Sequence, residues 1–152
     1  MARIAWIGLL AVAAAMPVDA VEGDARILGA SPGCVERRLG VVSVELGSKE
    51  VDMRSGMPAP RASYQAAFRR LAERAAAKGA DAVVLRGHEA GFVAKGSRRS
   101  VRPSFVSLRG AAIKLRDGGD SCALAVVDPV QFERDAIEKQ RQDVRKDAGV
   151  SF

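Results

Sequence analysis

Residues 61–85 read RASYQAAFRRLAERAAAKGADAVVL, and this stretch decides the fold. Its first part predicts an α-helix over 61–78, because apolar side chains recur at intervals of four, three and four residues and so share one helix face. These side chains are Tyr64, Phe68, Leu71 and Ala75. Gly79 follows, and glycine commonly ends a helix in the left-handed conformation. The unbroken apolar run after it predicts a strand over 81–85, buried on both faces.

The sequence on either side of this stretch supplies the remaining strands. A strand is predicted over 39–46 (LGVVSVEL), where three valines favour extended backbone. Together with the helix and the strand over 81–85 it makes a βαβ unit, so the two strands are expected to run parallel. A third strand is predicted over 104–115, and the DGGD turn at 117–120 predicts a hairpin to a fourth strand over 122–127.

A last helix is predicted over 129–148. Asp128 is a favoured N-cap, Pro129 suits the first helical position, and Gln131 is placed to reach back to the N-cap amide. The apolar stripe of this helix is thin and its other residues are mostly charged. With 152 residues the chain has room for one domain. The predicted fold is therefore one α/β two-layer domain: a small mixed sheet of about four strands, containing a βαβ unit, with a C-terminal helix.

The first twenty residues have the pattern of a signal peptide. A basic segment ending at Arg3 precedes an uncharged apolar run over 4–16, which Pro17 ends and small residues follow. The run is shorter than the roughly 20 residues that span a bilayer, and a buried N-terminal helix is the alternative interpretation. We expect a signal peptide over 1–20, an extended leader over 21–37, the α/β domain over 38–128 and the charged helix over 129–148.

Export changes how the two cysteines are interpreted. No Cys directly follows Ala20, so we expect a periplasmic or secreted protein with neither a lipid anchor nor stable membrane insertion. In an oxidising compartment an even pair of cysteines usually forms a disulfide. We predict a bond between Cys34 and Cys122, worth about 4–5 kcal/mol in the chain-entropy model. The alternative, a pair of redox-active thiols, lacks CxxC spacing.

The chain contains few residues that are candidates for a catalytic role. His88, in the run RGHEAG over 86–91, is the only histidine. Acyl-transfer triads, Cys–His pairs and zinc hydrolases all need a histidine in a defined relation to a nucleophile or a metal. We therefore predict no enzymatic activity, no cofactor and no resident metal. His88 and Glu89 together supply at most half of a metal site, and an exposed loop histidine is the alternative.

The chain has a formal charge of +6, and its basic residues are densest in two places. One is the helix over 61–78, and the other is the expected loop over 86–103. Candidate ligand-binding residues in and beside that loop are Arg86, His88, Glu89, Arg98, Arg99 and Arg102. Because export excludes nucleic acid as a routine partner, we expect anionic envelope components such as lipid head groups, lipopolysaccharide phosphates or acidic proteins. A solvated basic surface is the alternative.

Three segments carry a family resemblance: LGVVSVE at 39–45, AAAKGADAVVL at 75–85 and LRGAAI at 108–113. Over roughly residues 38–115 the chain resembles the Rcs stress-sensor outer-membrane lipoproteins and the wider set of small βαβ proteins, one branch of which is named for heavy-metal binding. The resemblance implies a compact periplasmic α/β domain that signals by protein contact and not by catalysis. The chain lacks that family's lipidation Cys and its four-cysteine disulfide pattern, and no binding residue is carried over.

The sequence thus predicts an exported, non-catalytic interaction or envelope stress-sensing protein with a protein partner in the envelope. A periplasmic module that binds a metal or an anion through the basic loop around His88 is the first alternative. A minor hydrolytic enzyme is the second.

Overall fold

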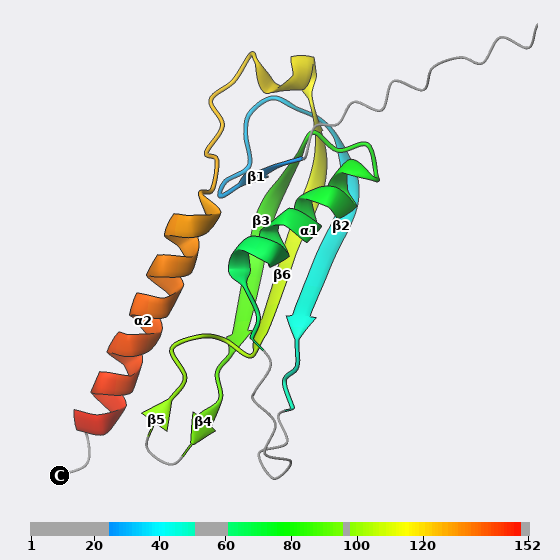
Figure 1. Ribbon diagram of the computed structural model, residues 1–152. Helices are drawn as coiled ribbons and strands as arrows, with labels where there is room; N and C mark the ends of the chain where they lie inside the picture. Colours follow the sequence, from blue (N-terminus) through cyan, green and yellow to red (C-terminus); the bar gives the residue numbers. More distant parts are fainter. Residues whose placement is uncertain (1–24, 51–60, 96–97, 150–152) are drawn as a thin grey trace, which may run out of the picture.

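The computed structural model describes residues 25–50, 61–95 and 98–149, except for the side chains of residues 94–99 and 142–149. The expected signal peptide over 1–20 lies outside the described residues. Figure 1 shows a sheet with α1 across one face and α2 beside β3. The elements, in chain order, are β1 (Arg26–Leu28), β2 (Val35–Gly47), α1 (Tyr64–Ala76), β3 (Ala82–Gly91), β4 (Ala94–Lys95), β5 (Arg98–Arg99), β6 (Phe105–Leu115), a 3-10 turn (Arg116–Gly119) and α2 (Pro129–Gly149).

The main sheet has four strands in the order β1-β3-β6-β2. β6 pairs antiparallel with both β3 and β2, while β1 pairs parallel with β3. β2 and β3 therefore run parallel to each other, as the βαβ pattern predicts, but β6 lies between them. The predicted mixed α/β architecture in one domain with a C-terminal helix is confirmed.

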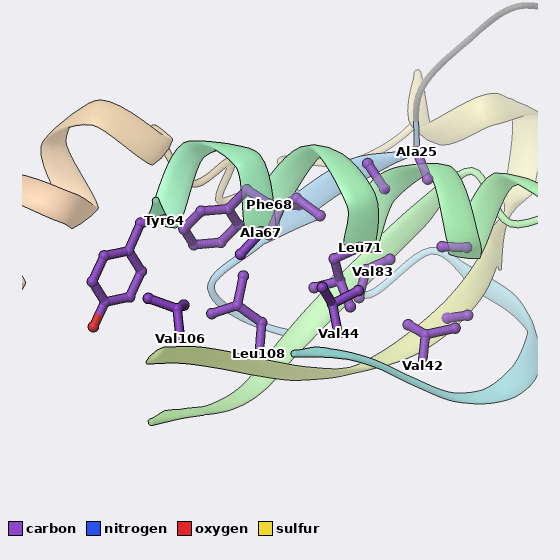
Figure 2. Close-up of a cluster of buried hydrophobic side chains, with 14 of the residues drawn as sticks. Ala25, Val42, Val44, Tyr64, Ala67, Phe68, Leu71, Val83, Val106 and Leu108 are labelled. Carbon is purple, nitrogen blue, oxygen red and sulfur yellow. The ribbon is translucent and has the colours of Figure 1, made fainter. Parts of the chain in front are cut away.

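α1 forms where the periodicity predicts and buries the predicted face. The Ser63 side chain caps the helix by accepting a hydrogen bond from the Ala66 amide (3.3 Å), as N-cap serines do. Figure 2 shows the apolar side chains of α1 directed at those of the sheet. From α1 these are Tyr64, Ala67, Phe68 and Leu71, and from the sheet Val42, Val44, Val83, Val106 and Leu108. The chain turns after the helix at Gly79, whose φ of 75° suits glycine.

A second, smaller apolar cluster lies on the other face of the sheet. Neighbouring side chains on a strand point to opposite faces, so Val83 joins the cluster under α1 while Ala82 and Val84 join the second one. Cys34 belongs to this cluster and is bonded to Cys122, with a Cα–Cα distance of 5.9 Å. The predicted disulfide is thus present, and it ties the start of β2 to the chain that follows β6.

The prediction of a hairpin from β6 to a fourth strand is wrong. Residues 116–119 form a 3-10 turn instead of a two-strand connection, and residues 122–127 make only an isolated antiparallel bridge, Val126 to Leu28. The hydrogen bonds of this segment go to β1: Val127 N–H donates to Ile27 O (2.9 Å) and Gly29 N–H donates to Ala125 O (2.8 Å). The fourth strand of the sheet is therefore β1, which lies inside the segment expected to be only an extended leader.

β3 is longer than predicted. The loop expected from Arg86 onward begins only after Gly91, because residues 87–91 continue to pair with β6 beyond a β-bulge between Leu85 and Gly87. The long pairing of β3 with β6 keeps Gly87 in the strand, although glycine has a weak strand propensity. The rest of the expected loop holds a short hairpin in which Ala94 pairs with Arg99.

α2 begins as predicted, with Asp128 as its N-cap. The Asp128 carboxylate accepts hydrogen bonds from the amides of Val130 (2.8 Å) and Gln131 (3.4 Å). The Gln131 side chain does not reach back to the cap but donates to Asp135 Oδ1 one turn later (2.7 Å). Among the residues that the structure describes, no helix is both long and apolar enough to cross a membrane.

Candidate functional site at the seam of α1 and α2

Four aromatic rings from three elements meet where α2 joins the domain. Phe132 of α2 lies at the centre of the group. Its ring centroid is 5.1 Å from that of Phe68, 5.5 Å from that of Tyr64 and 4.9 Å from that of His88. The His88 and Tyr64 rings also approach edge to face at 6.2 Å. Pairs with this geometry stabilise a contact beyond the area that they bury.

The register of β3 decides which side chains reach this cluster. His88 pairs with Leu108 of β6, which belongs to the core under α1, so the imidazole lies on the α1 side of the sheet. Glu89 is the next residue and therefore lies on the opposite face, where its carboxylate forms an ion pair with Lys49 Nζ (3.0 Å). His88 and Glu89 cannot converge on one ligand from opposite faces of the same strand.

Burial and charge act on the two polar rings of the cluster. His88 as a whole remains exposed, but partial burial of its ring against the cluster, and to a lesser extent the positive charge of Lys139 on α2, lowers the pKa of His88 below its ordinary value. Burial and the negative charge of Glu133 raise the pKa of the Tyr64 hydroxyl, whose residue is only 1% exposed. Both groups are therefore held neutral near pH 7.

A hollow lies beside the same seam, lined by residues of α1, of the start of α2 and of β1. It has a volume of about 510 Å³, and apolar side chains supply much of its lining. These are Ile27, Ala66, Phe68, Ala72, Pro129 and Val130. Gln65 crosses the seam, since its Nε2 donates to Glu133 Oε2 (3.2 Å). A second hollow of about 510 Å³ shares Gln65 and Val130 with the first and continues along α2 past Ile137 to Arg141.

No protein-family model, no curated protein and no solved structure matches this chain.

Of the four candidate ligand-binding arginines, the structure describes the side chains of two. Arg86 is exposed at the bulge of β3, and Arg102 is exposed beyond the short hairpin. Arg98 and Arg99 form β5, and their side chains lie outside what the structure describes. Within residues 25–50, 61–93 and 100–141, no group of three or more His, Cys, Asp or Glu side chains could hold a metal ion.

The seam itself was not predicted from the sequence. His88 was expected in a loop, whereas it lies on β3 against the Phe132 ring of α2. The thin apolar stripe of the last helix is evident in the sequence, but the place where it docks is not. One signal was available: Phe132 and Ala136 are spaced four residues apart, and both pack against the core.

Proposed function

We propose that this chain is an exported, non-catalytic domain that binds another protein of the cell envelope at the α1–α2 seam, with envelope stress sensing as its role. The observation that carries the proposal is the pair of adjoining hollows along the seam, which share Gln65 and Val130 in their linings. Val130 lines both hollows and is half-exposed, at 49%. A hollow lined by apolar side chains and edged by charged ones has the composition of many protein-binding surfaces.

Export is supported by the signal-like pattern over 1–20 and by the disulfide between Cys34 and Cys122. Intact-mass measurement of the protein recovered from outside the cytoplasm tests it. We expect a chain that starts near Val21, carries no lipid and has lost two hydrogens to the disulfide. A retained Met1, an acylated N-terminus or two free thiols would contradict export as argued.

A non-catalytic role is supported by the surroundings of the only histidine. His88 is packed against Phe132 and Tyr64, and its neighbour Glu89 faces the other side of the sheet. A general base has to reach a proton on a bound substrate, and its partner groups have to converge on the same point. Among the described residues, the ring contacts of His88 are with aromatic side chains, whereas a general-base site needs polar partner groups beside the histidine.

The shape of the two hollows favours a helical partner segment. Val130 and Arg141 are eleven residues apart on α2, which corresponds to about 16 Å along a helix axis. An amphipathic helix placed along the two hollows would bury one apolar face against Val130 and Ile137. The rim carries both signs of charge, including Arg69 and Glu133, so the expected partner helix is apolar on one face and mixed in charge beside it.

Site-specific photocrosslinking tests this assignment. A photoreactive amino acid at position 130 should give one discrete adduct in the envelope, and the adduct is identified by mass spectrometry. Position 41 is the matched control, because Val41 is also about half-exposed (53%) but lies on the far face of the sheet. The same adducts from both positions, or none from position 130, would contradict binding at the seam.

A second candidate function, contact with anionic envelope components, is favoured by the exposed edge of α1. Arg70 and Arg74 of α1 and Lys78 just beyond its end follow one another at intervals of four residues, and none of them pairs with a carboxylate among the described residues. Cosedimentation with phosphatidylglycerol vesicles tests this function. Binding should fall steeply between about 0.05 and 0.5 M salt, because such attraction is screened. Equal recovery with neutral vesicles would exclude it.

A further inference from the structure

We infer that the disulfide between Cys34 and Cys122 is a redox switch: its reduction by a dithiol releases residues 120–128 and loosens the docking of α2, while the sheet and α1 stay folded. We call residues 120–128 the strap. The use of this switch by the cell rests on the function proposed above, because Pro129 and Val130, which follow the strap, line the proposed binding surface. The switch itself is a property of the folded chain.

The strap joins the 3-10 turn to α2 (Figure 1) and is held against the domain by few contacts. Two backbone hydrogen bonds link it to β1 and the residue after β1. Val127 N–H donates to Ile27 O (2.9 Å), and Gly29 N–H donates to Ala125 O (2.8 Å). None of the strap residues is buried, and the half-buried ones are Cys122, Leu124 and Val127. A segment with so few buried contacts opens locally at low cost unless something else holds it.

The disulfide is not needed to hold together the two strand ends that lie beside it. Cys34 directly precedes β2, and its carbonyl accepts a hydrogen bond from the N–H of Arg116, which follows β6 (2.9 Å). The next residue, Val35, pairs with Leu115 in the β2–β6 ladder. The backbone therefore already joins Cys34 to the end of β6. In the folded chain the sulfur–sulfur bond adds the attachment of the strap, so its reduction acts on the strap and not on the sheet.

The strap is also the tether that holds α2 near its docking site. With the disulfide closed, the last covalently fixed point before the helix is Cys122, six positions before the N-cap Asp128. With the disulfide open, the last residue bonded to β2 is Arg116, twelve positions before the cap. Doubling a flexible tether lowers the effective concentration of the attached segment about threefold. α2 docks largely through Phe132 in its first turn, so the longer tether weakens the seam.

The chemical step is a thiol–disulfide exchange in which a dithiol is the reductant. Cys122 is half-buried whereas Cys34 is only 5% exposed, so a thiolate of the dithiol attacks Sγ of Cys122. The bond between the two cysteine sulfurs breaks, and Cys34 leaves as a thiolate that takes up a proton. The second thiolate of the dithiol then attacks its partner sulfur in the mixed disulfide and frees Cys122 as a thiol. The dithiol is oxidised to a disulfide, and two electrons and two protons pass to the cysteines.

NMR relaxation of the backbone amides tests the switch in the full chain, with dithiothreitol as the dithiol. We expect reduction to lower the order parameters of the strap amides from about 0.85 to below about 0.6, the range of flexible backbone. Arg26 is the internal control, because its amide donates to Asp81 O (3.0 Å) and does not depend on the strap. The amides of Arg26 and of the β3–β6 ladder should stay near about 0.85.

The ring signals of Tyr64, the only tyrosine, report the docking of α2, because the Phe132 ring lies 5.5 Å away. We expect them to move on reduction. The Cys34→Ala, Cys122→Ala double variant should show the reduced behaviour without dithiothreitol and no further change when it is added.

Three results would overturn the inference. Strap order parameters that stay near about 0.85 after reduction would show that the strap does not need the disulfide. Tyr64 signals that do not move would show that α2 is held independently of it. Order parameters that fall at Arg26 and across the β3–β6 ladder as well would show that the disulfide supports the whole fold. No partner is present in these measurements, so they can fail while the proposed function holds, and the reverse is also true.

Discussion

Arg74 on α1 donates a hydrogen bond from Nη1 to the backbone carbonyl of Ser43 on β2. Lys78, one turn later, donates from Nζ to the carbonyl of Val41 (3.0 Å). β2 is an edge strand of the sheet, so the backbone groups on its outer side have no neighbouring strand in the sheet. Unpaired carbonyls on an edge strand invite pairing with another chain, and cationic side chains are a known means of blocking it.

Removing both cations should therefore promote self-association. We expect Arg74→Ala with Lys78→Ala to show concentration-dependent dimers or larger species in sedimentation velocity. Arg69→Ala with Arg70→Ala is the matched control, because it removes the same charge from the same helix and leaves both carbonyl contacts intact. Equal association of the two double variants would attribute the effect to net charge and not to the strand edge.

Phe132 should carry much of the energy that docks α2. Phe132→Ala removes three ring contacts from a partly buried site, and we expect the free energy of unfolding to fall by about 1–3 kcal/mol. Urea titration followed by circular dichroism measures it. Val130→Ala, in the same helix but half-exposed, should change the same quantity by no more than about 0.5 kcal/mol. A Phe132→Ala chain as stable as the wild type would show that α2 is held elsewhere.

Asp81 should make stability depend on pH in the acid range. Burial raises the pKa of its carboxyl, but the hydrogen bonds from the Leu115 amide (2.9 Å) and Lys114 Nζ (3.0 Å), together with the charges of Lys114 and Arg26, outweigh burial and lower it. A carboxyl whose pKa is lowered by folding stabilises the fold above its unfolded value, about 3.9, and this contribution is lost as the pH falls through the folded value.

Asp81→Asn should consequently cost about 1–2 kcal/mol at pH 7, and the difference from the wild type should shrink as the pH falls below about 4. Chemical denaturation at several pH values measures both. Asp120→Asn, at an exposed position, should track the wild type throughout. A constant difference between Asp81→Asn and the wild type from pH 7 to pH 3 would contradict the role assigned to the charge.

The disulfide should stabilise the fold chiefly by linking distant parts of the chain. Cys34 and Cys122 are 88 positions apart, and we expect reduction to lower the free energy of unfolding by about 2–4 kcal/mol. The Cys34→Ala, Cys122→Ala double variant should show the same loss and no further response to reductant. If reductant lowered the free energy of unfolding of this variant by the same amount, the loss would not come from the disulfide and the prediction would be contradicted.

The local parts of the fold could be predicted from the sequence, whereas the parts that depend on distant pairing could not. The spacing from Tyr64 to Ala75 encodes α1 within itself, and Asp128 encodes the start of α2. β1 has only three residues, and its place beside β3 is set by the ladder from Arg26 to Ala82, which no local pattern reveals. Residues 122–127 have a strand-like composition, yet their hydrogen bonds go to β1.

The same distinction between local pattern and distant pairing applies to the candidate site. The sequence identified His88 as the distinctive residue, but its environment depends on the bulge after Leu85, which determines the face on which the imidazole lies. One residue more or fewer in that bulge would exchange His88 with Glu89. The contact with Phe132 joins positions 44 residues apart in the sequence, and only the docking of α2 brings them together.

The affinity of the purified domain for the protein crosslinked at position 130 tests the central claim most directly. Isothermal titration calorimetry with the wild type, Val130→Glu and Val41→Glu compares the seam with an equally exposed valine on the far face. Binding at the seam predicts that Val130→Glu weakens the affinity at least about tenfold, the equivalent of 1.4 kcal/mol, while Val41→Glu binds like the wild type. Unchanged affinity in a folded Val130→Glu domain, or an equal loss in both variants, would contradict it.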